Sequence, residues 1–201
     1  AHSSFSTPIE LLEFMQSLRE LSLNKPVGFK FCVGHPWEWF GMVKAMQETR
    51  ILPDFIVVDG AEGGTGAAPL EFSDHIGMPL KEGLRLVHNT LVGVGLREHV
   101  KLGASGKIIT SFDIARALAL GADWCNSARG FMFALGCIQA MQCNKNTCPT
   151  GITTHDPKLQ RGLVTSDKAV RVANYQKNMI KEISVIAHSC GVKNPRHLQR
   201  K

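Results

Sequence analysis

The stretch FIVVDGAEGGTGAAP, residues 55–69, joins a short apolar run to a loop rich in glycine. A short apolar run bounded by turn residues is typical of a strand in a parallel sheet. The small residues allow backbone N–H groups to approach a bound group closely, and Thr65 adds a hydroxyl. A plain flexible loop is the alternative, because glycine-rich loops are common. The stretch therefore predicts a strand that ends in a candidate binding loop.

The rest of the chain repeats this order of a strand followed by a helix. The run Thr7-Pro8-Ile9-Glu10 has a capping residue, a proline at the first helical position and a glutamate at the third, which together predict a helix start. Alternating strands and helices favour an α/β fold with a parallel sheet. The expected strands are 27–33, 55–59, 100–104 and 123–127. The expected helices are 7–23, 38–50, one that follows Pro79 and ends near Arg97, 112–120 and 168–190.

Composition limits the class of protein. The chain has 201 residues, of which 44% are hydrophobic and 20% charged, as in ordinary globular proteins with one sizeable core. Six cysteines are too few for a disulfide scaffold, and no signal-like N-terminus precedes them, so we expect a reducing compartment, the cytoplasm. No apolar run approaches the length of a membrane span. The net charge of +6 is concentrated in residues 193–201 without interleaved aromatics, which indicates a solvated end and not a nucleic-acid arm.

A lysine lies within the first expected strand. Gly28, Lys30 and Cys32 share one face of that strand, and bulky apolar residues share the other. If the sheet closes into a barrel, Lys30 points inward. An ammonium is rarely buried without a partner, so an anionic ligand or a developing negative charge is the favoured interpretation, and a structural ion pair is the alternative.

The third and fourth strands end in glycine-containing junctions. Gly106 and Lys107 follow the third strand, and Arg129 and Gly130 follow the fourth. Exposed amides at helix starts, with charge added by Arg129, suit a phosphate monoester. Phosphate sites after the seventh and eighth strands recur in (β/α)8 barrels.

Three cysteines lie close together in GCIQAMQCNKNTCPTG, residues 136–151. Cys137, Cys143 and Cys148 have the spacing C-x5-C-x4-C, and Pro149 closes the run. Thiolates on a short turn-rich loop predict an iron–sulfur site, and three ligands fit a three-iron cluster better than a four-iron one. The alternatives are three free cysteines, or zinc, which normally takes four protein ligands including a closely spaced pair.

Two tryptophans follow the first expected strand. Trp37 and Trp39 come after Gly34-His35-Pro36. They could form a lid over a barrel mouth, although simple packing of the loop is the safer interpretation.

Taken together, the 55–69 stretch, the Gly106 junction, the run GFMFALGC at 130–137 and the cysteine spacing resemble the FMN-binding synthase domain of glutamate synthases. The resemblance is closest to stand-alone glutamate synthase-like proteins and covers about residues 26–156. It implies a TIM-type barrel that binds FMN beside a 3Fe-4S cluster. It also implies the reduction of 2-iminoglutarate, formed from 2-oxoglutarate and ammonia, to glutamate.

The resemblance assigns roles to individual residues. It implies that Lys30 lies near the flavin, where a cation would stabilise the anionic reduced form. Residues implied to ligate the cluster are Cys137, Cys143 and Cys148; those implied to hold FMN are Gly63, Gly64 and Thr65 in the flavin-side loop and Gly106, Lys107, Arg129 and Gly130 in the phosphate loops. The chain departs from glutamate synthases at Ala128-Arg129-Gly130, where Gly-Thr-Gly is usual, and at Glu62, where aspartate is common. A related imino or keto acid is therefore an alternative substrate.

Four strands are half of the number that a TIM-type barrel needs, and about 250 residues are typical of a complete one. The expected strands match the fifth to eighth of the family's barrel. We therefore expect the C-terminal half of a (β/α)8 barrel in residues 1–136, a cluster loop in 137–150 and a helical tail in 151–201.

The expected partners are the missing N-terminal half or a second copy of the chain, and an electron donor such as ferredoxin or an NAD(P)H-oxidising subunit. Pairing with a second copy would bury sheet edges that otherwise aggregate. The leading hypothesis is a fragment of an FMN and iron–sulfur oxidoreductase. The alternatives are an FMN-dependent isomerase and a non-catalytic half-barrel without cofactors.

Overall fold

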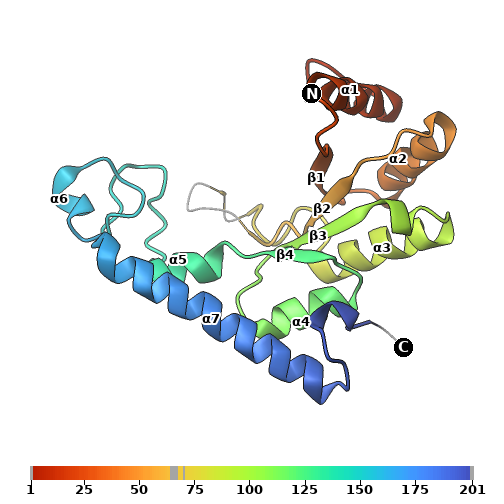
Figure 1. Cartoon of the computed structure of the whole chain (residues 1–201). Helices are drawn as coiled ribbons and strands as arrows, with labels where there is room; N and C mark the ends of the chain where they lie inside the picture. The colour runs from red at the N-terminus through yellow and green to blue at the C-terminus, as the bar shows by residue number, and fades with distance from the viewer. Residues whose placement is uncertain (1, 64–67, 70, 200–201) are drawn as a thin grey trace.

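The computed structural model describes residues 2–63, 68–69 and 71–199, and its centre is a parallel sheet (Figure 1). The strands lie side by side in chain order, and Phe29, Ile56 and Leu102 occupy one row across it. The four expected strands are confirmed within one residue at each end. They are β1 (Gly28–Cys32), β2 (Phe55–Asp59), β3 (Lys101–Ser105) and β4 (Trp124–Asn126).

Helices connect successive strands and pack on one face of the sheet (Figure 1). Ile56, Val58, Leu102 and Ala104 alternate along β2 and β3 and are fully buried against these helices. Removing such apolar side chains from water is the main stabilising term of the fold. The connecting helices are α2 (Pro36–Thr49), α3 (Leu80–Gly93) and α4 (Ser111–Ala119), whereas α1 (Pro8–Leu21) precedes β1.

The start of α1 is confirmed, the predicted C-terminal ends of two helices are wrong, and α2 and the C-terminal helix α7 (Thr165–Ser189) begin two and three residues before their predicted starts. Thr7 and Glu10 form the capping box that the sequence predicts. Helix α1 ends at Leu21, because the left-handed backbone of Leu23, with φ of 58°, cannot continue a right-handed helix. Helix α3 ends at Gly93, ahead of Gly95, whose φ is +73°, and a separate 3-10 turn η1 covers Arg97–His99.

The other face of the sheet carries aromatic and polar side chains, and one of the aromatic rings lies on a glycine. A Cβ added at Gly103 would lie 2.6 Å from the ring of Trp124, so glycine is required for this ring to lie flat on β3. Phe55 meets Trp124 edge to face at a centroid distance of 6.0 Å. Lys30 lies on this same face, and 56% of its side chain is exposed. We call this surface the inner face, because it would line the interior if the sheet closed.

Two aspartates clamp the amino end of the sheet in the same way. Asp54 Oδ2 accepts hydrogen bonds from Val27 N at 2.7 Å and Arg19 Nη2 at 2.9 Å. In the second clamp, Asp123 Oδ2 accepts from Arg97 Nη2 at 2.8 Å. The arginine precedes its aspartate by 35 residues in the first clamp and by 26 in the second. Each carboxylate therefore lies just before one strand, β2 or β4, and holds the segment that precedes the neighbouring strand, β1 or β3.

The C-terminal third packs as a long helix against α4 and α5 (Figure 1). The helix expected at 168–190 is present, and its Met179 and Ile183 are buried. Ser111, 2% exposed, donates to Glu182 Oε2 at 2.8 Å and so joins α4 to this helix. The elements are α5 (Arg129–Leu135), α6 (Pro157–Gln160), α7 (Thr165–Ser189) and the 3-10 turn η2 (Pro195–His197). Among the described residues, no helix is long and apolar enough to cross a membrane.

The two tryptophans after β1 have different environments. Trp39 is 1% exposed and stacks on Phe31 at a centroid distance of 5.3 Å, so it belongs to the core and does not cover the barrel mouth. Trp37 is 65% exposed and stacks on His35 at 4.2 Å. The packing interpretation is therefore confirmed for Trp39.

Candidate functional site

The carboxyl ends of the strands bring four polar side chains into one row. The register aligns Cys32 of β1 with Asp59 of β2, Asp59 with Ser105 of β3, and Ser105 with Asn126 of β4. Because alternate residues share a face, all four belong to the inner face. Sequence analysis did not single out this row. It becomes visible only when the register of neighbouring strands is known.

Lys30 lies one layer below this row and pairs with it. Its Nζ lies 2.7 Å from Asp59 Oδ2, and the side chains of the two residues are 56% and 26% exposed. The expected inward orientation is therefore found, and so is the structural ion pair that was its alternative. The role of Lys30 toward an anionic ligand stays a prediction.

Cys32 lies beside this ion pair as a neutral thiol. Burial raises the pKa of Cys32, and the negative charge of Asp59 raises it further. Gly77, with φ of +101°, packs against the sulfur, because a Cβ there would collide with Cys32 Sγ. The thiol therefore contributes shape and not charge to the row.

The loops after β2 and β3 touch through glycines. Gly60 N donates to Ser105 O at 2.8 Å, and a Cβ on Gly106 would lie 3.3 Å from Gly60 N. Gly106 has φ of +151°, which L side chains rarely adopt. Of the predicted flavin-side residues, Gly63 is exposed with open space around its Cα, whereas Gly64 and Thr65 lie outside the described residues.

One carboxylate pairs with Lys107 of the predicted phosphate loops and also senses the charge of Arg129. Lys107 Nζ lies 2.8 Å from Asp74 Oδ2. The hydrogen bond from Lys107 is the main cause that lowers the pKa of Asp74, and the charge of Arg129 lowers it as well. An anion that bound between Lys107 and Arg129 would therefore compete with Asp74.

Gly130 is required by packing. A Cβ at this position would collide with the hydroxyl of Tyr175, which reaches past α5 to donate to Ile109 O. Ser127 Oγ donates to Ile108 O at 2.7 Å, so the loops after β3 and β4 are fastened together. The glycine that sequence analysis assigned to phosphate binding thus has a structural reason of its own, and its phosphate contact stays a prediction.

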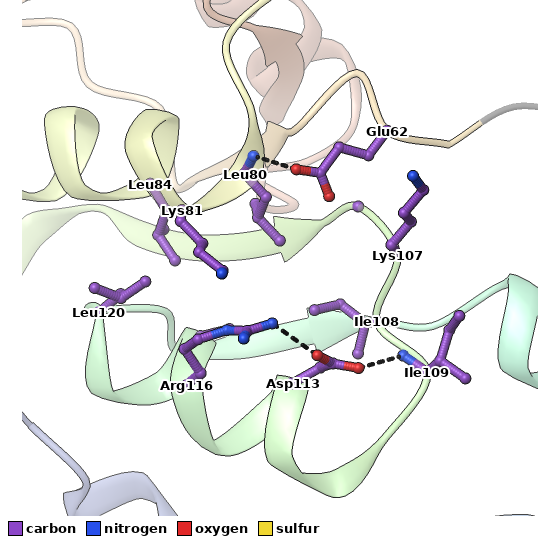
Figure 2. Close-up of a pocket in the computed structure, with 12 residues that line it drawn as sticks. Glu62, Leu80, Lys81, Leu84, Lys107, Ile108, Ile109, Asp113, Arg116 and Leu120 are labelled. Atoms are coloured by element: carbon purple, nitrogen blue, oxygen red, sulfur yellow. Dashed lines mark hydrogen bonds and ion pairs between the residues drawn. The ribbon is translucent and has the colours of Figure 1, made fainter. Parts of the chain in front are cut away.

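A pocket of about 360 Å³ lies between α3 and α4, next to the Gly106 loop. Figure 2 shows Lys81 and Arg116 extending into it from the two helices. Its carboxylates already have partners: Asp113 Oδ1 lies 2.7 Å from Arg116 Nη2, and Glu62 Oε1 accepts from Leu80 N at 3.1 Å. Lys107 and Arg116 are paired with carboxylates, whereas Lys81 makes no ion pair within the described residues, so the pocket contains one cation without a carboxylate partner.

The three cysteines of the predicted cluster are free and half-buried. Within the described ranges, no group of three or more His, Cys, Asp or Glu side chains could hold a metal ion, so Cys137, Cys143 and Cys148 do not converge. Burial raises the pKa of Cys148, but hydrogen bonding, including the contact of its sulfur with Thr150 Oγ1 at 3.3 Å, outweighs this and lowers the pKa to about 6. This thiolate suits a metal in its chemistry. The loop would have to close to bring the three sulfurs together, and cluster ligation stays a prediction.

Comparison with known proteins identifies relatives along nearly the whole chain. The family described as "Conserved region in glutamate synthase" matches residues 1–193. The glutamate synthase large subunit-like protein YerD of Bacillus subtilis is 45% identical over 196 residues, which cover 98% of this chain and 37% of that protein. The archaeal glutamate synthase [NADPH] of Methanocaldococcus jannaschii is 35% identical, covering 91% of this chain and 35% of that protein. The chain thus spans little more than a third of these relatives.

Solved structures give the fold. A variant of flavocytochrome b2 matches with a TM-score of 0.52 and 18% identity, covering 92% of this chain and 37% of that one. The α/β prediction is confirmed: four parallel strands alternate with helices, match part of a TIM barrel, and are followed by a long C-terminal helix.

Proposed function

Because this chain belongs to the glutamate synthase family, we propose that it is part of an FMN and iron–sulfur dependent oxidoreductase that reduces 2-iminoglutarate to glutamate, or a related imino acid. The single observation that carries the proposal is the inner face of the sheet. There Lys30 and the row that contains Asp59 lie at the carboxyl edge, where parallel α/β proteins bind ligands.

The residues on this edge have suitable chemistry for FMN. The ammonium of Lys30 would face the flavin ring. Gly63, Gly64 and Thr65 would form the loop on the flavin side of the barrel. The phosphate would be held by Gly106, Lys107, Arg129 and Gly130. Gly106 has a φ of +151° that favours glycine, and its missing Cβ lets the loop after β2 pack against it at Gly60, so the two loops that would hold FMN lie together. FMN would supply the hydride chemistry, while the protein binds and orients it.

Cys137, Cys143 and Cys148 would ligate a 3Fe-4S cluster. The proposal is supported by three free thiols on one loop, one of which has its pKa lowered to about 6. A reducing compartment such as the cytoplasm would keep these thiols available for iron. An electron donor such as ferredoxin or an NAD(P)H-oxidising subunit would feed the cluster.

The sheet also needs a partner. Strands β1 and β4 each have one hydrogen-bonded neighbour in the described sheet, so each has an unpaired edge. The N-terminal half of the barrel would pair with both edges and cover Phe55, Val57 and Trp124 on the inner face. A second copy of this chain is the alternative partner.

A specific observation favours a second candidate, a half-barrel without cofactors. In the described structure Lys30 and Lys107 are already paired with Asp59 and Asp74, and the three thiols do not converge. Such a chain would remain folded without FMN or iron. Its function would then belong to a longer protein.

The experiment that separates the candidates is an anaerobic absorbance spectrum of the purified chain, alone and with FMN added, together with iron and acid-labile sulfide assays. The oxidoreductase predicts flavin bands and about three irons per chain. Cys148→Ser should lower the iron content, whereas Cys190→Ser, a matched control at an exposed cysteine outside the loop, should not. If neither FMN nor iron binds to the chain, either alone or in complex with an N-terminal half, the proposal is refuted.

A further inference from the structure

Lys30 has no anionic neighbour in its own row of the described sheet, and this determines the direction of its side chain. Its Cα lies opposite Val57 of β2, and the next inner-face residue along β2 is Asp59, two residues later. The next residue in the same row is Gly103 of β3, so the lateral neighbours of Lys30 are apolar or carry no side chain. The ammonium therefore finds no anion in its own row and reaches toward the carboxyl edge.

Asp59 supplies the anion at that edge. Its Oδ2 lies 2.7 Å from Lys30 Nζ, and within the described residues it is the carboxylate found at ion-pair distance from this lysine. Cys32, opposite Asp59, does not compete for the ammonium, because burial and the charge of Asp59 raise its pKa and keep it neutral. The direction of the Lys30 side chain therefore depends on one residue.

The same carboxylate also fixes the start of the glycine-rich loop. Asp59 Oδ1 accepts a hydrogen bond from Ala61 N at 3.0 Å. Ala61 has φ of 53°, in the left-handed region that costs energy for a residue with a Cβ, and this hydrogen bond helps to hold it there. One side chain thus connects the inner-face lysine to the backbone of the candidate binding loop.

We propose that Asp59 is a positioning residue that aims the ammonium of Lys30 at the carboxyl edge and fixes its place relative to the glycine-rich loop. This rests on the proposed function, because Lys30 is assigned to the flavin there. A flavin bound at this edge then meets an ammonium that is already oriented, which lowers the cost of ordering a long flexible side chain on binding.

The first test needs no cofactor. Reductive methylation with ¹³C-formaldehyde labels the lysines, and the resonance missing from Lys30→Met identifies Lys30. In Asp59→Asn the amide oxygen can still accept from Ala61 N, whereas the ion pair is lost. We expect the Lys30 resonance to move, because the carboxylate that lies 2.7 Å from its ammonium is lost. Asp54→Asn, which removes an ion pair at the opposite end of the sheet, should leave that resonance unchanged. An unchanged Lys30 resonance in Asp59→Asn would overturn the proposal.

The second test uses the FMN-loaded protein with sulfite as the probe, because a positive charge near the flavin stabilises the anionic adduct. Removing the negative charge of Asp59 by itself favours the anionic adduct, so the proposal requires the lost orientation of Lys30 to outweigh this gain: Asp59→Asn should still weaken sulfite binding, by about twofold to fivefold, and Lys30→Met should weaken it more. In the Lys30→Met background, where no ammonium is left to orient, Asp59→Asn should no longer weaken sulfite binding. If Lys30→Met weakens sulfite binding and Asp59→Asn does not, Asp59 has no positioning role. If the unchanged protein binds no FMN, the proposed function fails, and the methylation experiment still decides the role of Asp59.

Discussion

Replacing Asp54 by alanine should destabilise the fold in a manner that depends on pH. The carboxylate of Asp54 holds Val27 N at 2.7 Å, and Arg19 through Nη2 at 2.9 Å and Nε at 3.3 Å. Burial alone raises the pKa of Asp54, but these hydrogen bonds and the charge of Arg19 outweigh it, so that the pKa lies below its ordinary value. The folded state therefore favours the ionised carboxylate.

The size of the effect follows from the groups left without a partner. Removing one partner of a buried hydrogen bond costs about 1 to 3 kcal/mol. The Arg19 side chain is 18% exposed and Asp54 is 43% exposed, so water replaces part of the lost contact. We therefore expect Asp54→Ala to lower the free energy of unfolding by about 2 kcal/mol at pH 7, near the middle of that range.

Urea denaturation followed by circular dichroism at several pH values would measure this cost. A carboxyl whose folded pKa is depressed contributes stability that is fully present above its unfolded pKa of about 3.9 and is lost as pH falls through the folded pKa. The difference between the original chain and Asp54→Ala should therefore shrink below about pH 4. An equal difference at pH 7 and pH 3 would refute the reasoning, because the ionised form would then contribute nothing.

Three further predictions concern the candidate site. Gly130→Ala should lower the melting temperature because its Cβ collides with the hydroxyl of Tyr175, and the same change should cost less in a Tyr175→Ala background; an equal cost in both backgrounds would assign the glycine requirement elsewhere. Asp74→Asn should tighten the binding of inorganic phosphate or FMN severalfold in a fluorescence or calorimetric titration, because the competing carboxylate is removed, and unchanged affinity would place the anion away from Lys107. Cys148 should react with iodoacetamide with a midpoint near pH 6 in the iron-free chain, as mass spectrometry of labelled peptides would show, and a midpoint near that of an ordinary thiol would contradict the hydrogen bonding by Thr150.

Local signals in the sequence were sufficient for the elements. The capping run at Thr7 and Glu10 places the start of α1, because those hydrogen bonds form between residues three apart. Ranges such as 55–59 are correct because a short apolar run between turn residues has few alternatives. The predicted ends of α1 and α3 were less accurate. Leu23 and Gly95 adopt left-handed backbone conformations after these helices, and a leucine gives no sign of this in the sequence.

Contacts between distant residues explain what the sequence did not predict. Lys30 and Asp59 are assigned to different strands from sequence, but their pairing depends on register. Gly130 fits a phosphate loop by its position, yet the collision with Tyr175 arises from α7, which is far along the chain.

The sequence by itself determined the order of strands and helices, the inner-face position of Lys30 and the family to which the chain is similar, because periodicity, caps and motifs are properties of neighbouring residues. Only the tertiary structure decided which groups those residues meet. Asp74 pairs with Lys107 of a predicted phosphate loop, and the three cysteines stay apart within the described residues, because both outcomes depend on how loops pack in three dimensions.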